Sequence, residues 1–256
     1  MTSFSLAGKR ALVVGIANDQ SIAWGIAHAL HDAGAELAIT YLNDKAKPHV
    51  EPLATAVGAP IFTKLDVSRP DEEQALFEEI ARVWGSLDIL VHSIAFAPKG
   101  DLHGRVVDAS AEGFSLAMDV SVHSFIRLVH LAEPLLQPGG ACLTMSFYGA
   151  EKVVSNYSIM GPVKAALEAT TRQLAAELGP SGVTVNALSP GTIATRASSG
   201  IANFKQMMDD AAERTPLKRL ATIDDVGAGA VFLASPAGRN ITGTTLHIDA
   251  GFHVMA

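Results

Sequence analysis

A phenol and an ammonium group stand seven residues apart in the stretch from Ser155 to Gly179, which has the composition of a helix. They are Tyr157 and Lys164, with Met160 between them. Seven residues make close to two turns of an α-helix, so the spacing predicts that both side chains project from one face. That face would hold a proton donor beside a cation. The same residues also fit an amphipathic helix with a surface lysine and a half-buried tyrosine.

Pro162 bears on this choice because it lies inside the spacing. A proline lacks the backbone amide, and its ring disturbs a helix that has already started. If the helix begins at Pro162, the same-face argument for Tyr157 does not hold. The rest of the chain must decide between the two interpretations.

Composition predicts one compact domain over residues 1–256. Hydrophobic residues make up 48% of the chain and charged residues 18%, which is typical of a globular protein with a sizeable core. The formal net charge is −7 and no run of Lys or Arg occurs, so neither a nucleic acid nor an anionic membrane surface is expected as a partner.

The cysteine and histidine content predicts no metal site. Cys142 is the only cysteine, which excludes an intrachain disulfide and a multi-cysteine metal site. None of the nine histidines has a metal-ligand spacing. No stretch reaches transmembrane length and no secretory cleavage pattern follows the first apolar run, so a cytoplasmic location is expected.

Short apolar runs rich in Val, Ile and Leu alternate with helical patterns along the whole chain. This alternation predicts an α/β fold, a single doubly wound Rossmann-type domain with a seven-stranded parallel sheet. The expected strands are 11–15, 36–41, 60–65, 89–93, 141–146, 183–188 and 245–248. The expected helices are 22–33, 46–56, 71–84, 111–135, 157–178 and 223–234.

The longest connection, 189–215, is expected to form a substrate-binding loop with a short helix around 204–212. It follows the carboxyl end of an expected strand, where ligands bind in α/β folds. Long loops in compact domains are usually lids or binding loops.

The turn after the first expected strand, from Gly15 to Gly25, has the position of a phosphate-binding turn. Gly15 would let the backbone approach a pyrophosphate, and Ser21 is a natural helix N-cap. The free amides of the first helical turn, which starts at Ile22, would supply donors to an anion. Gly25 would let the helix pack closely on the strand. An ordinary strand-to-helix turn explains the same residues.

The residues that follow the second and third expected strands indicate which cofactor is expected. Tyr41-Leu42-Asn43 has no Arg or Lys to bind a 2′-phosphate, which favours NADH over NADPH, although Lys45 and Lys47 keep NADPH open. Asp66 would hydrogen-bond the adenine amine and Val67 would pack on its ring. Asp66 would equally serve as the N-cap of a turn.

These features together resemble the short-chain dehydrogenase/reductase superfamily over nearly the whole chain. Within it, three motifs look like the enoyl-acyl-carrier-protein reductase branch, which carries out the last reductive step of fatty acid elongation. They are the Gly-x5-Ser turn, the run His92-Ser93-Ile94-Ala95-Phe96-Ala97 and Tyr-x6-Lys. The superfamily is also matched by Val185 to Gly191 and by Ile241 to Gly251.

The resemblance implies a mechanism and a set of site residues. Hydride would pass from NADH to C3 of a trans-2-enoyl thioester, the Tyr157 hydroxyl would hold the developing enolate oxygen, and Lys164 would bind the ribose hydroxyls. The phenol stands a turn earlier than in ketoreductases because the reacting carbon of an enoyl thioester lies two bonds from the carbonyl carbon. Further cofactor contacts are implied at Ile94, Ile193, Ala194 and Thr195. An acyl pocket is implied at Ala97, Met160, Ile201 and Phe204, although such apolar residues often belong to the core.

The sequence also departs from the family pattern. Phe147 occupies a position where the family often has a second tyrosine, and Tyr148 is expected to face the other way because strand neighbours alternate. The motif Tyr148-x3-Lys152 resembles the ketoreductase pair but lies at a strand end, so it is left out of the site. His92 is expected to be structural.

The expected partners follow from the resemblance. The substrate is an enoyl thioester on acyl carrier protein, or on coenzyme A because around Phe204 only Lys205 is basic, with Arg196 upstream. The chain is expected to form a homotetramer. Two other functions remain: a short-chain reductase acting on a carbonyl, and a dinucleotide-binding regulatory protein without turnover.

Overall fold

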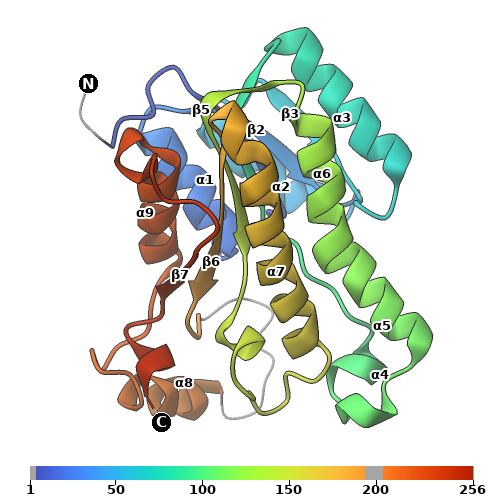
Figure 1. Ribbon diagram of the computed structural model, residues 1–256, viewed down its shortest axis with the longest axis vertical. Coiled ribbons are helices and arrows are strands. Elements are labelled where there is room, and N and C mark those ends of the chain that lie inside the picture. The colour runs from blue at the N-terminus through green and yellow to red at the C-terminus, as the bar shows by residue number, and fades with distance from the viewer. Residues whose placement is uncertain (1–3, 194–203, 256) are drawn as a thin grey trace.

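Seven parallel strands form a single sheet in the computed structural model, in the order β3-β2-β1-β4-β5-β6-β7 (Figure 1). The structure describes residues 4–193 and 204–255, and of 204–207 only the backbone. The strands are β1 (Arg10–Val14), β2 (Glu36–Tyr41), β3 (Ile61–Lys64), β4 (Leu87–His92), β5 (Leu136–Met145), β6 (Thr184–Pro190) and β7 (Thr245–Ile248). The predicted seven-stranded, doubly wound sheet is confirmed.

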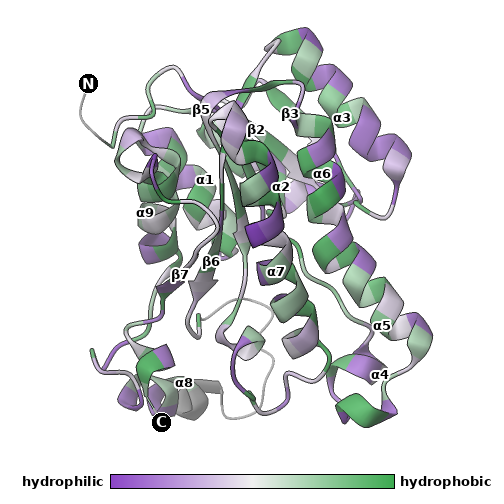
Figure 2. Cartoon of the chain, viewed as in Figure 1, coloured by the Kyte–Doolittle hydropathy of each residue, from purple (hydrophilic) through white to green (hydrophobic). Residues whose placement is uncertain are grey.

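Helices cover both faces of the sheet. The core on one face is shared by α1 (Ile22–Asp32), α2 (Lys47–Ala56) and α9 (Ile223–Ala234), and on the other by α3 (Pro70–Val83), α6 (Ser124–Ala132) and α7 (Met160–Leu178). Alternate strand residues serve the two cores: Leu12 and Val14 pack on one face, Ala11 and Val13 on the other. Purple and green positions accordingly interleave along α3 and α6 in Figure 2.

The remaining helices lie around the carboxyl ends of the strands. They are α4 (Lys99–Leu102), α5 (Ala111–Met118) and α8 (Phe204–Glu213). In Figure 1, α4, α8 and the C-terminus gather in the lower part of the view. The strand order reverses between β1 and β4, and in open α/β sheets ligands bind at such a switch point. In the described ranges, no helix is both long and apolar enough to span a membrane.

The predicted helix 111–135 is interrupted and ends early. A π-helical turn, η2 (Asp119–His123), separates α5 from α6, and α6 ends at Ala132. Hydrogen bonds of the Ser124 side chain account for the interruption. Ser124 Oγ donates to the Val120 carbonyl at 2.6 Å and lies 2.8 Å from His92 Nε2 on β4. Bulges of this kind arise where side chains enter the helical hydrogen-bond ladder.

The predicted start of the 157–178 helix is also wrong, because α7 begins at Met160. Pro162 is its third residue, in the first turn, where a missing amide has no intrahelical partner to lose. Tyr157 therefore precedes the helix that carries Lys164. The same-face argument for the two side chains does not hold, and their relation must come from other contacts.

Gly25 packs on a helix and not on a strand. A Cβ at this position would lie 2.4 Å from the Ile223 carbonyl oxygen of α9. Gly227 of α9 is the matching position, because a Cβ there would lie 2.5 Å from the Gly25 carbonyl oxygen. Two glycines thus let α1 and α9 touch through their backbones.

Candidate active site

A cavity of about 500 Å³ lies at the switch point of the sheet. The loops after β1, β2, β3 and β4 all contribute to its wall. Four of the predicted cofactor residues line it: Gly15, Asp66, Val67 and Ile94. The wall also includes Thr40, Leu42, Leu65, Ser68, Leu116 and Val120.

Gly15 is required by its contact with β4 as well as by its conformation. Its φ is +109°, and a Cβ would lie 2.1 Å from the carbonyl oxygen of Ser93. Side chains rarely adopt this backbone region. The glycine therefore holds the end of β1 against the end of β4, which brings two cavity walls together.

Ser21 stands at the N-cap of α1 as predicted, yet its hydroxyl does not cap the helix. It donates to the Asn18 carbonyl at 2.5 Å and accepts from the Ala17 amide at 3.4 Å. The amides of the first turn of α1 thus have no side-chain cap from Ser21. Ser21 and Ile22 lie outside the lining of the cavity, at the helix start that follows it.

Asp66 fits both predicted roles. Its Oδ1 accepts from the Ser68 amide at 2.9 Å and from the Ser68 hydroxyl at 2.7 Å, which closes a turn after β3. The same residue lines the cavity beside Val67. The turn fixes the carboxylate at the cavity wall.

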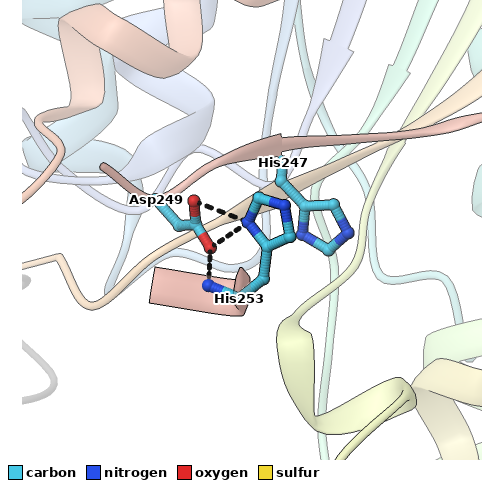
Figure 3. A group of neighbouring side chains, drawn as sticks. All are labelled: His247, Asp249 and His253. Atoms are coloured by element: carbon cyan, nitrogen blue, oxygen red, sulfur yellow. Dashed lines mark hydrogen bonds and ion pairs between the residues drawn. The ribbon is translucent and has the colours of Figure 1, made fainter. Parts of the chain in front are cut away.

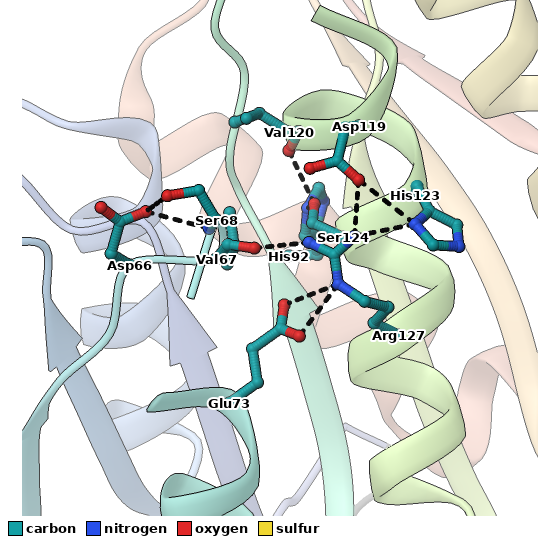
Figure 4. A network of polar contacts seen from close by, with 10 residues as sticks. All are labelled: Asp66, Val67, Ser68, Glu73, His92, Asp119, Val120, His123, Ser124 and Arg127. Carbon is teal, nitrogen blue, oxygen red and sulfur yellow. Dashed lines mark hydrogen bonds and ion pairs between the residues drawn. The ribbon is translucent and has the colours of Figure 1, made fainter. Parts of the chain in front are cut away.

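A buried ion pair stands behind Val67 (Figure 4). Arg127 of α6 binds Glu73 of α3, with Nε 2.9 Å from Oε2, and Nη1 is 2.7 Å from Asp119 Oδ1. Its Nη2 donates to the Val67 carbonyl. Glu73 is only 1% exposed; burial raises the pKa of its carboxyl and Arg127 opposes this. The network therefore holds the backbone of a cavity wall from behind.

His92 is structural, in agreement with the prediction. It is buried on β4 between Thr144 Oγ1, at 3.0 Å from Nδ1, and Ser124 Oγ, at 2.8 Å from Nε2. Burial, helped by the charge of Lys164, lowers the pKa of His92 to about 3. It stays neutral and links β4 to β5 and to the start of α6; its contact with Ser124 is drawn in Figure 4.

The cavity wall has no charge suited to a 2′-phosphate. Among the described residues that line it, none is Lys or Arg. Lys47 lies elsewhere, 5.8 Å from the centre of the Tyr41 ring and 3.9 Å from Glu51 Oε1.

Tyr157 lies in a tight turn before α7. Its neighbours Asn156 and Ser158 have φ of 62° and 42°, in the left-handed region. Such strained backbone persists only where surrounding contacts impose it. Here Ser158 Oγ donates to the Asp101 carbonyl at 2.8 Å. Burial raises the pKa of Tyr157, so its hydroxyl stays protonated and able to donate.

The Tyr157 ring packs on the segment that follows β5. Its centre is 4.8 Å from that of Phe147, and a Cβ at Gly149 would lie 2.5 Å from its Cδ1. Tyr148 instead packs edge-on against Phe252, with ring centres 5.5 Å apart. Phe147 and Tyr148 thus contact different rings, but both lie after the end of β5, so the alternation expected of strand neighbours is not the cause.

Lys164 is a buried cation on α7. It is 4% exposed, and its Nζ donates to the Met145 carbonyl at 2.6 Å. Burial lowers the pKa of Lys164 to about 8, while the negative charge of Glu168, one turn along, acts in the opposite direction. At neutral pH the ammonium form still dominates.

Comparisons with known proteins agree with this arrangement. A family model described as Enoyl-(Acyl carrier protein) reductase matches residues 15–253. The chain belongs to the enoyl-acyl-carrier-protein reductase family. The NADH enoyl-acyl-carrier-protein reductase FabI of Haemophilus influenzae is 46% identical over 98% of this chain and 96% of its own length.

Two crystal structures of the family have the same fold. The NADH enoyl-acyl-carrier-protein reductase of Aquifex aeolicus is 46% identical, with a TM-score of 0.93 over 98% of both chains. The reductase of Anaplasma phagocytophilum, solved in complex with NAD, is 45% identical, with a TM-score of 0.94 over 98% of this chain and 96% of its own.

Of the other predicted site residues of this enoyl reductase, some lie in the core and others lie outside the described residues. Met160 and Ala97 are buried, at 4% and 8% exposure, and pack in the core beneath α7. Ile193 packs against the core of α1 and α9. Phe204 is the first residue of α8, and its side chain is outside the described residues. Ala194, Thr195 and Ile201 also lie outside the described residues.

Sequence analysis of this reductase missed several residues that shape the site. Leu116 and Val120 reach the cavity because the helix is interrupted at η2, which helical periodicity alone does not show. Arg127 contacts Val67 across 60 residues of sequence, and no local pattern marks it. Glu168 was detectable, because a carboxylate four residues after Lys164 on a helix shares its face.

Proposed function

We propose that the chain reduces the 2,3 double bond of a trans-2-enoyl thioester with NADH, as the last reductive step of fatty acid elongation. The observation that carries the proposal is a protonated Tyr157 fixed in a strained turn, beside a helix that holds Lys164 as a buried cation. The relatives from Haemophilus influenzae and Aquifex aeolicus are named as NADH enoyl-acyl-carrier-protein reductases, which supports the same chemistry here.

The described residues fit a dinucleotide. Asp66 and Val67 would hold the adenine, Gly15 lets the backbone turn beside the cavity, and the uncapped amides of α1 from Ile22, beside Ser21, would bind the pyrophosphate. Lys164 would bind the ribose hydroxyls, and Ile94, Ile193, Ala194 and Thr195 would surround the nicotinamide. None of the described residues that line the cavity is a cation, which favours NADH over NADPH. When bound, the cofactor supplies the hydride.

The chain's own part is to stabilise charge. The Tyr157 hydroxyl donates a hydrogen bond to the thioester oxygen as it gains enolate character. One such donor typically lowers the barrier by roughly 3 to 4 kcal/mol. Lys164 adds positive potential beside the phenol and positions the ribose. Because the phenol is protonated in the free protein, no proton has to be moved before the hydride step.

The substrate side rests on the connection 189–215 of a single domain that spans residues 1–256. We propose that this segment, with Ile201 and Phe204, covers the acyl chain, and that Ala97 and Met160 support it from the core. The thioester is carried by acyl carrier protein, as the names of the relatives indicate; coenzyme A is the alternative carrier.

A homotetramer is proposed from the exposed apolar surface. Phe114 on α5 is 39% exposed and Ile126 on α6 is 36% exposed, and β7 forms an edge of the sheet. Light scattering coupled to gel filtration measures the mass directly. A monomer at micromolar concentration would contradict the tetramer and leave the proposed reaction intact.

The decisive experiment follows NADH oxidation with a 2-enoyl thioester, carried by acyl carrier protein or coenzyme A, beside an acetoacetyl thioester and an NADPH arm. We expect turnover of the alkene with NADH. Reduction of the ketone but not the alkene would refute the proposal. Tyr157→Phe should lower kcat by about 10²- to 10³-fold while NADH still binds. An unchanged kcat would remove Tyr157 from its role.

A further inference from the structure

Two histidines and a carboxylate converge after β7, outside the cavity of the proposed reaction. His247 lies on β7, Asp249 follows it, and His253 lies in the short helix η6 (Phe252–Val254). One ligand atom from each residue lies within 4.8 Å of the others. Figure 3 shows the two rings side by side with Asp249 next to His253. The group departs from the expectation, drawn from sequence spacing, that no histidine belongs to a metal site.

One ring nitrogen of His247 is buried and unsatisfied by the described residues. Its Nδ1 is buried and has no hydrogen-bond partner in the part of the chain that the structure describes, while its Nε2 lies 3.4 Å from Glu151 Oε1. A carboxylate next to Nε2 favours the tautomer with the proton on that atom. The lone pair on Nδ1 is then a buried acceptor to which none of the described residues donates, which is costly unless a hydrogen-bond donor or a cation is supplied.

The carboxylate and the second histidine are already held in place. Asp249 Oδ1 accepts from the Gly251 amide at 3.0 Å, and Oδ2 accepts from the His253 amide at 2.8 Å. His253 Nδ1 is 2.9 Å from Asp249 Oδ2, and the two imidazole rings stack with centres 4.0 Å apart. In metal sites, ligating carboxylates are hydrogen-bonded and ligating histidines donate their other N–H to a carboxylate. Asp249 shows the first feature, and His247, whose Nε2 lies 3.4 Å from Glu151 Oε1, shows the second.

We infer that His247, Asp249 and His253 form a binding site for a divalent cation of the zinc class. Two imidazoles and one carboxylate are the ligands such a cation prefers, with the fourth position left to water. Mg²⁺ prefers all-oxygen ligands and should bind poorly. A tetrahedral ion with bonds of about 2.1 Å needs ligand atoms roughly 3.4 Å apart, so the group must contract slightly.

The surroundings allow that contraction. The side chain of His253 is 31% exposed, so it can move without disturbing the core. The group borders a pocket of about 430 Å³ formed with Pro216, Leu217 and Arg219, which gives the ion a route from solvent. Bound metal would tie η6 to β7. Because Phe252 of η6 packs on Tyr148, it would also steady the segment beneath Tyr157.

Equilibrium dialysis of the purified full chain against Zn²⁺, with metal analysis, tests the inference. We expect one tightly bound Zn²⁺ per chain and no comparable binding of Mg²⁺. His253→Ala should abolish tight binding. Glu151→Gln keeps all three ligands and changes a half-exposed residue, so it should fold normally, and should weaken binding about 10- to 100-fold.

The matched control is His28→Ala. His28 Nδ1 lies 3.4 Å from Asp32 Oδ2 on an exposed helix face, and no third ligand joins this pair among the residues that the structure describes. Its loss should leave Zn²⁺ binding unchanged. Absence of tight binding in the wild type, or equal binding by wild type and both His253→Ala and Glu151→Gln, would overturn the inference. Neither result would bear on the proposed reductase activity, which is measured separately.

Discussion

Lys164→Met should remove the proposed activity and should stabilise the protein relative to the wild type. This gain in unfolding free energy over the wild type should be larger at neutral than at alkaline pH. Burial lowers the pKa of Lys164 from 10.5 to about 8. At 1.36 kcal/mol per pKa unit, keeping the ammonium form in the folded state costs roughly 3 kcal/mol at pH 7. Methionine fills a similar volume without that cost. The Met145 carbonyl loses its donor, which costs about 1 to 3 kcal/mol, so at pH 7 the variant should be at least as stable as the wild type.

The pH dependence gives the sharper test. Because the folded pKa of Lys164 lies below the unfolded one, the unfolded chain binds more protons between pH ~8 and ~10.5, and the wild type gains stability as pH rises through that window. The difference in unfolding free energy between variant and wild type should fall by about 2 kcal/mol from pH 7 to pH 9.5. Other groups titrate alike in both proteins and cancel.

Urea unfolding at both pH values, at one protein concentration and without NADH, measures this difference. Lys45→Met, at an exposed lysine, is the control and should show no such change. A difference in unfolding free energy between variant and wild type that stays constant from pH 7 to 9.5 would refute the idea that Lys164 is held charged at a cost.

Glu168→Gln removes the charge that raises the pKa of Lys164, so the alkaline fall of kcat/KM should move to lower pH.

Two other variants test the supports of the site. Arg127→Lys keeps the positive charge next to Glu73 but loses the planar guanidinium that also binds the Val67 carbonyl. KM for NADH should therefore rise about tenfold, the equivalent of one hydrogen bond, with kcat nearly unchanged. An unchanged KM in steady-state kinetics would show that the cavity wall at Val67 does not depend on Arg127. Gly149→Ala places a Cβ 2.5 Å from Tyr157 Cδ1 and should lower kcat about 100-fold, while the NADH affinity measured by fluorescence titration stays the same. Gly179→Ala is the control and should keep full activity, because a Cβ there meets nothing within 4 Å. Equal activity of the two variants would contradict the proposed packing.

The sheet was predictable because its strands are buried on both faces. A strand of that kind is a short apolar run between helical patterns, and β2 and β7 begin and end at the predicted residues. The helix α9 also begins and ends at the predicted residues, and the structure shows a capping box of Thr222 and Asp225 at its start. Elements whose signals are local were therefore found from sequence.

The turn that carries Tyr157 was not predictable in the same way. A left-handed Asn156 is common in turns, but Ser158 at φ 42° has no local signal and depends on its bond to Asp101, 57 residues away. The helical composition after Ser155 favoured an earlier helix start, and tertiary contacts outweighed it. The interrupted helix at η2 has the same explanation, since its cause lies on β4.

The spacing of seven residues between Tyr157 and Lys164 therefore does not set their relation through a shared helix face. Both are held by the end of β5 and the segment after it. The Met145 carbonyl accepts from Lys164, and the Phe147 ring packs at a tilt against the Tyr157 ring. Between these two positions, Ser146 donates to Glu168 at 2.5 Å. Three consecutive residues thus place the cation, its balancing carboxylate and the phenol, so the stretch 145–147 positions the groups that the stretch 157–168 supplies.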